Sequence, residues 1–281
     1  MATFIDTFAS STVGAAPTGW TRQWNASDSP LVVADATALE GKHIRMPAAN
    51  GRRFYSFDAA GTPTDYEILT RARISVSNLG RFWMAGRGDP TVDCVQAGVY
   101  NGATSTTMAR YVNGGGGLLS GASTYNPNIQ VGQWFRQRVR VSGNQAWYKA
   151  WTDEANEPAG WNIGPLTDTV MPQVAGWVGI MVDAGGDGRD FDWFSVGTNG
   201  DTAPDPTVAP EPELLPPAGL TATPFADRVE LSWSAVAEAD SYDIDRDEVV
   251  IITGLTATQY VDRGVAPGDT PSYRVRSGLS S

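Results

Sequence analysis

The sequence has few of the residues that a disulfide framework or nucleophilic chemistry requires. It contains one cysteine and one histidine in 281 residues. Because a single cysteine cannot form an internal disulfide, stability must come from core packing, which suits synthesis in a reducing cytoplasm. A zinc site is not expected without a second histidine or cysteine. We therefore interpret His43 and Cys94 as structural residues.

The chain also has fewer basic than acidic residues, and it lacks long apolar runs. Its formal net charge is −11, so a phosphate backbone is repelled and nucleic acid is not an expected partner. No apolar stretch approaches the ~20 residues of a membrane helix, which argues against membrane insertion. The amino terminus, MATFIDTFASSTVG, shows no basic start followed by an apolar stretch, so we expect no signal peptide.

What the sequence does contain is glycine, proline and alternating strands. Hydrophobic residues make up 41% of the chain, with 31 Gly and 18 Pro, which favours short strands joined by turns. In residues 66–76, Ile68 and Ile74 share one face while Glu67 and Arg71 share the other, and no segment keeps a 3.6-residue period. This predicts an all-β fold of two packed antiparallel sheets. Further strands are expected at 52–57, 80–88, 94–100, 135–141, 145–151, 177–183 and 191–197.

A proline-rich stretch divides the chain. Residues 201–217 read DTAPDPTVAPEPELLPP, and each proline removes a backbone donor and fixes φ. We therefore predict a linker at 201–217, between a first domain at 1–200 and a second at 218–281.

In residues 1–200, the stretch YKAWTDEANEPAGWN is followed by GWVGIMVD and then by FDWFSVG. This order of motifs resembles the laminin-G-like, concanavalin-A-like jelly rolls of bacterial surface and phage tail proteins. The opening FIDTF resembles the first strand of that family, which pairs beside the last strand. The resemblance implies a jelly-roll β-sandwich. The positions that carry it are Lys149, Trp151, Glu157, Pro158, Trp161, Val178, Gly179, Asp192, Phe194 and Val196.

Residues 218–281 resemble a fibronectin type III domain, an immunoglobulin-like sandwich. Only six strands are counted where that family has seven, so the last strand is missing. Either the protein continues past Ser281, which we favour, or a neighbouring subunit donates the strand. The expected core residues are Leu220, Val229, Leu231, Trp233, Tyr242, Ile244, Tyr273 and Val275.

One acidic cluster has the spacing of a cation site. Asp183, Asp187 and Asp190 surround Gly188, and calcium takes several oxygens from such loops. The jelly-roll relatives often carry a structural calcium, although Asp and Gly are also ordinary turn residues. We predict no required cofactor and a possible structural calcium at these three aspartates.

Aromatic residues in polar loops are the candidates for sugar contact. Tyr125 in GASTYNPN and Trp161 in EPAGWN lie outside the strands, and aromatic faces pack against pyranose rings; anchoring of the loops is the alternative. The stripe Arg136, Arg138 and Arg140 is predicted to be the solvent face of a strand, where an acidic subunit could dock.

No catalytic group is expected. A glycoside hydrolase of this fold needs two carboxylates aimed into a cleft, and the cluster at Asp153, Glu154 and Glu157 reads as a solvated loop.

The resemblances imply a phage minor tail protein, made in the host cytoplasm and assembled into the virion tail. It would form a homo-oligomer, contact other tail subunits and bind a host cell-wall glycan through many weak sites. Three alternatives stay open. They are a purely architectural tail decoration, a glycan hydrolase and a bacterial extracellular carbohydrate-binding module.

Overall fold

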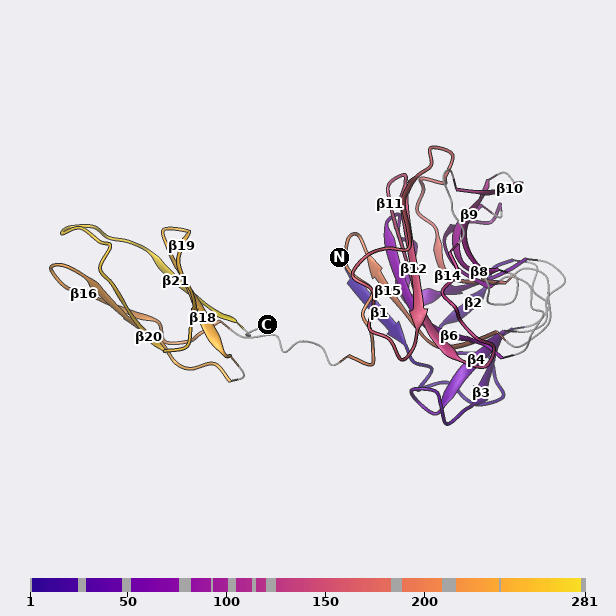
Figure 1. The fold of residues 1–281 in the computed structure, drawn as a ribbon, viewed down its shortest axis with the longest axis horizontal. Coiled ribbons are helices and arrows are strands. Elements are labelled where there is room, and N and C mark those ends of the chain that lie inside the picture. Colours follow the sequence, from indigo (N-terminus) through magenta and orange to yellow (C-terminus); the bar gives the residue numbers. More distant parts are fainter. Residues whose placement is uncertain are drawn as a thin grey trace. The chain divides into compact units, whose positions relative to one another are not determined.

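The chain separates into two compact units, Met1–Val208 and Ala209–Ser281 (Figure 1). The regular secondary structure of the described residues is β-strand, apart from the 3₁₀ turn η1 (Asp58–Ala60), and none of them forms an apolar helix of membrane-spanning length. The computed structural model describes residues 2–24, 29–46, 52–75, 82–91, 93–100, 105–112, 115–119, 125–182, 189–208, 216–237 and 239–278.

The first unit packs two antiparallel sheets face to face, so the predicted all-β jelly-roll sandwich is confirmed (Figure 1). The larger sheet has the order β13-β12-β11-β6-β15-β4-β3, and β1 also pairs with β15. The expected pairing of the first strand beside the last is therefore present. Its strands are β1 (Ala2–Asp6), β3 (Leu31–Ala34), β4 (Lys42–Met46), β6 (Tyr66–Ile74), β11 (Trp134–Ser142), β12 (Gln145–Thr152), β13 (Ile163–Thr167) and β15 (Arg189–Thr198).

The second sheet has the order β10-β9-β8-β7-β14-β5-β2. Gly115–Leu118 pairs antiparallel with the end of β9. Its strands are β2 (Trp20–Arg22), β5 (Arg53–Phe57), β7 (Phe82–Gly88), β8 (Cys94–Tyr100), β9 (Ser105–Val112), β10 (Gly115–Leu118) and β14 (Trp177–Val182).

The core lies between the sheets and follows the two-residue period of the strands. On β6, Ile68, Ala72 and Ile74 are buried in the shared core, as the alternation predicted. On β11, Phe135 and Val139 are buried in the same core. The opposite face of the larger sheet is therefore free to carry its charged side chains.

The second unit consists of two three-stranded antiparallel sheets, β16-β17-β20 and β19-β18-β21. Its core contains the six expected residues Val229, Leu231, Trp233, Tyr242, Ile244 and Val275, with Leu220 and Tyr273 packed against them. The strands are β16 (Thr221–Pro224), β17 (Val229–Ser232), β18 (Ser241–Arg246), β19 (Val249–Leu255), β20 (Gln259–Asp262) and β21 (Tyr273–Gly278).

The start of the predicted linker differs from the structure. Residues 201–208 belong to the first unit, and Ala203 is only 1% exposed. The reason is an apolar island of Leu69, Trp151 and Trp193 on the outer face of the larger sheet, which Ala203 covers. Proline content alone could not show that this part of the stretch packs against a sheet.

Candidate functional site: the outer face of the larger sheet

The outer face of the larger sheet is an ordered array of charged and aromatic side chains. Strand pairing places every second residue of four neighbouring strands in register on this face. From β15 through β6 and β11 to β12, the rows are Gly197–Glu67–Arg140–Trp147, Ser195–Leu69–Arg138–Lys149 and Trp193–Arg71–Arg136–Trp151.

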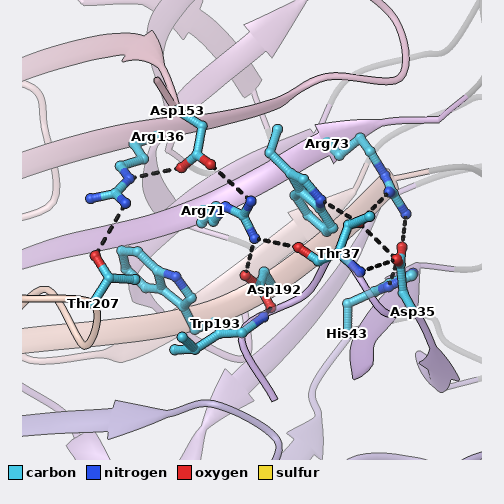
Figure 2. Close-up of polar contacts among 12 residues, drawn as sticks. Asp35, Thr37, His43, Arg71, Arg73, Arg136, Asp153, Asp192, Trp193 and Thr207 are labelled. Atoms are coloured by element: carbon cyan, nitrogen blue, oxygen red, sulfur yellow. Dashed lines mark hydrogen bonds and ion pairs between the residues drawn. The ribbon is translucent and has the colours of Figure 1, made fainter. Parts of the chain in front are cut away.

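Arg71 is the central cation of the third row. It contacts Asp153 at 2.8 Å and Asp192 at 2.5 Å, and Asp153 also accepts from Arg136 at 2.9 Å (Figure 2). Arg73, one pleat further along β6, pairs with Asp35 at 2.6 Å (Figure 2). Each of these arginines is thus paired with at least one carboxylate, in a chain whose formal net charge is −11.

These contacts control the ionisation of the carboxyl groups. Partial burial favours the neutral form of Asp35, but hydrogen bonds from Thr37 and Arg73 outweigh it and lower its pKa to about 2. At Asp153 the same opposition, with Arg71 and Arg136 as donors, also leaves the pKa below its usual value. Asp192 differs, because burial dominates there and raises its pKa despite the contact with Arg71. Asp35 and Asp153 are therefore held in the ionised form.

Trp134 is held rigidly at the edge of the array. Its indole Nε1 donates to Thr37 Oγ1 at 2.9 Å. The guanidinium groups of Arg71 and Arg73 lie 4.7 and 4.2 Å from its ring centroid, and the His43 ring meets it edge-on. The ring is thus a fixed wall whose flat surface is already occupied by cations.

Beside Trp134 the face is hollowed. This Trp134 hollow, of about 490 Å³, lies between the loop at 128–133 and the end of β12. The loop is shaped by its own polar groups, since Asn126 Oδ1 accepts from the Asn128 N–H at 2.9 Å. The other lining residues are Arg71, Gln130, Gly132, Gln133, Thr152, Asp153 and Glu154.

The hollow offers several planar polar groups at once. The side chains of Asn128, Gln130, Gln133 and Glu154 are exposed there, while Asp153 is fixed by its arginines. Amides supply both a donor and an acceptor, and carboxylates supply paired acceptors. Such a set matches a ligand with neighbouring hydroxyl groups, each of which can donate and accept.

The two aromatic residues predicted to contact sugar are separated. Tyr125 precedes the loop of the Trp134 hollow, but it packs partly buried against the core. Trp161 lies by β12, with Lys149 Nζ 5.0 Å and Arg140 5.3 Å from its ring centroid. Two cations thus lie over the Trp161 ring, as two lie over Trp134, and Trp161 is not among the residues that line the Trp134 hollow.

The calcium prediction is only partly covered by the described residues. Asp183 and Asp187 lie outside them. Asp190 is fully buried, and its oxygens accept from Arg45 at 2.7 Å and Arg73 at 2.9 Å. These oxygens are engaged by cations, so Asp190 is not an open ligand. Within the described ranges, no three histidine, cysteine or acidic side chains are grouped to hold a metal ion.

The arginine stripe is only in part the solvent face that the alternation predicted. Arg138 is 5% exposed and binds Glu67, which is itself 1% exposed. Glu157 approaches Arg138 from the other side at 2.7 Å, so it is not a freely solvated loop residue. The prediction was wrong for Arg138 and in part for Arg136, because residues 203–207 lie over them, whereas the Arg140 side chain stays 41% exposed. A periodicity cannot show what lies over a sheet.

Sequence reasoning also missed the amides of the Trp134 hollow. The segment NPNIQVGQW holds Asn128, Gln130 and Gln133 just before Trp134, and that clustering of amides beside an aromatic was the available signal.

A second aromatic cluster, on the outer side of the smaller sheet, is buried and so is not accessible to a ligand. There Trp83 is 2% exposed, with Trp24 and Phe54 equally covered.

Comparison with known proteins gives distant similarities. The sequence matches no protein-family profile. Over 87 residues it is 39% identical to a poly(3-hydroxybutyrate) depolymerase of Delftia acidovorans, a match that covers 31% of this chain and only 17% of that enzyme.

Two solved structures have a similar arrangement over the larger part of the chain. Carbohydrate-binding module CBM66 of Bacillus subtilis has a TM-score of 0.43 at 17% identity, covering 67% of this chain and 96% of the module. The exoplasmic/lumenal domain of VIP36, in a Ca²⁺- and mannose-bound form, has a TM-score of 0.42 at 12% identity, with 65% and 84% covered. Likeness at this level does not identify a function.

Proposed function

We propose that the first unit is a non-enzymatic carbohydrate-binding module whose binding site is the Trp134 hollow. The observation that supports this most is the convergence of exposed amides and an arginine-fixed carboxylate, Asp153, on one shallow depression. A few placed polar groups beside an aromatic wall are what fix the orientation of a polyhydroxylated ligand.

The ionisation of the site favours binding over hydrolysis. A glycoside hydrolase needs a general acid that is still protonated near neutral pH. Asp153 is instead held in the ionised form, because Arg71 and Arg136 keep its pKa below the usual value. Asp192, whose pKa is raised, is fully buried and bound to Arg71, so a substrate cannot reach it.

The charge of the face favours a neutral glycan. Arginines and carboxylates are paired along it, and the chain as a whole carries −11. A uronate or phosphate-bearing polymer would meet arginines that are already paired with carboxylates, and it would be repelled by the acidic chain. Affinity should therefore depend only weakly on salt.

The biological setting remains a proposal from the sequence resemblance. In a virion tail, a glycan-binding first unit and a fibronectin type III-like second unit would serve host attachment in a homo-oligomer. In an extracellular multidomain protein, the same unit would anchor its neighbours to a polysaccharide. Both settings need the same binding site, whereas a purely architectural role needs none.

The test is binding of the full chain to neutral polysaccharides and to cell walls, measured by depletion and by calorimetry. The double variant Gln130→Ala/Gln133→Ala should bind at least about 5-fold more weakly, since each lost hydrogen bond contributes roughly 0.5–1.5 kcal/mol. Gln259→Ala, an exposed amide of the second unit, is the matched control. Equal binding by the wild type, the double variant and the control would show that the Trp134 hollow is not the binding site. If the wild type does not bind any of the polysaccharides, the purely architectural role is the one that stands.

A further inference from the structure

Residues 201–207, here the covering segment, cross the outer face of the larger sheet without joining it as a strand. The Ala203 N–H donates to Glu67 Oε1 at 3.1 Å, and the Ala203 carbonyl accepts from Arg138 at 3.0 Å. Arg136 holds the far end through Asp205 and through Thr207 Oγ1 at 3.1 Å (Figure 2). Side chains of the sheet, and not a ladder of backbone bonds, therefore hold this segment.

The covering segment buries two tryptophans but does not satisfy their indole N–H groups. Trp151 is 4% exposed and Trp193 is fully buried, in one apolar island with Leu69 and Ala203. Neither indole N–H of this pair has a hydrogen-bond partner in the part of the chain that the structure describes. A buried donor without an acceptor carries an uncompensated desolvation penalty. An occupant that offered acceptor oxygens would satisfy these two groups better than the covering segment does.

Open hollows lie at both ends of the covered region. One is the Trp134 hollow, and the other, the Trp147 hollow, has about 240 Å³ and includes Glu67, Arg140, Trp147 and Asp201. Both are formed by β6, β11 and β12. From Trp147 to Thr152 on β12 the distance is about 17 Å at the usual rise of a strand. The row of Trp193, Arg71, Arg136 and Trp151 lies between them.

We propose that the covering segment occupies a cryptic groove for a linear, neutral polysaccharide. When the segment lifts, Trp151 and Trp193 present aromatic faces and two N–H donors, and the two hollows become one continuous site. Sugar hydroxyl and ring oxygens accept from the indoles, and the apolar faces of the pyranose rings pack against them. This inference rests on the proposed function and extends it from a single hollow to the whole sheet face.

The experiment loosens the cover without touching the groove. The variant Asp205→Ala/Thr207→Ala removes both contacts of Arg136 with the segment, and Asp269→Ala/Thr270→Ala in the second unit is the matched control. We expect the loosened protein to bind a long neutral polysaccharide at least about 5-fold more tightly. Binding of a disaccharide, which fits within the Trp134 hollow, should not change. Adding Trp193→Phe, which keeps an aromatic ring but removes the donor, should reverse the gain by roughly 2- to 10-fold.

Amide hydrogen exchange of the full chain separates the outcomes. Faster exchange of residues 202–207 in the loosened protein, together with an unchanged affinity for the long polymer, would overturn the groove while leaving the Trp134 hollow intact. Exchange no faster than in the wild type would show that the cover is a fixed part of the unit, which also overturns the proposal. Failure of the disaccharide and the polymer to bind any of the proteins would refute the proposed function itself.

Discussion

Replacing Glu67 by Gln tests what holds the charged face together. Glu67 is 1% exposed and binds both Arg138, whose side chain is 6% exposed, and Arg140, at 2.5 Å. Gln keeps the size of the side chain but removes its charge, so a buried guanidinium loses its main counter-ion. Breaking a buried pair in this way costs about 3–5 kcal/mol.

The environment of the two arginines places the expected loss at the lower end of that range. Arg138 keeps Glu157 at 2.7 Å, and the Arg140 side chain is 41% exposed, so water can solvate it. We therefore expect the free energy of unfolding of the first unit to fall by about 3 kcal/mol. For a unit of this size, that corresponds to a Tm lower by about 6–12 °C.

Urea unfolding followed by tryptophan fluorescence measures this loss, because Trp233 is the only one of the ten tryptophans in the second unit. Glu157→Gln is the control, since Glu157 binds the same Arg138 but its side chain is 34% exposed. We expect it to lose about 1 kcal/mol or less. If Glu67→Gln unfolds within 1 kcal/mol of the wild type, the buried carboxylate is not what stabilises the arginine rows, and the reasoning fails.

Three further changes probe other parts of the molecule. The pKa of Asp35 is lowered to about 2, so its stabilising contribution is complete above about pH 4 and should be lost between pH 4 and 2; thermal melts of Asp35→Asn should lack that part of the acid dependence. Gly179→Ala places a methyl group against a carbonyl of β5 and should cost about 1–3 kcal/mol in chemical denaturation, whereas Gly160→Ala, with open space around it, should cost far less. Asp262→Asn weakens the contacts with Arg246 and Tyr273 and should lower only the calorimetric transition of the second unit.

The strands and their inward residues could be predicted because they follow from local rules. Alternation on residues 66–76 placed Ile68 and Ile74 in the core, and the structure confirms both. The core of the second unit was predicted from the family resemblance, and it includes Tyr242 of β18 and Trp233, which directly follows β17. A period of two fixes which side of a strand is apolar, whatever lies elsewhere in the chain.

The candidate site was much less predictable. Tyr125 and Trp161 were chosen because they stand in polar loops, yet one packs on the core and the other lies against two cations. The Trp134 hollow instead joins residues from three separate stretches, around positions 71, 130 and 153. Their proximity depends on the order of strands in the sheet, which no local pattern contains.

The sequence by itself determined that this protein is built of antiparallel strands with alternating apolar and charged faces, and that it divides near a proline-rich stretch. Three features are visible only in the folded chain: Arg138 is covered, residues 201–207 cover it, and two tryptophans are buried beneath them. The physical reason is that alternation records the chemistry of each face of a strand, while burial depends on which distant segment packs over that face.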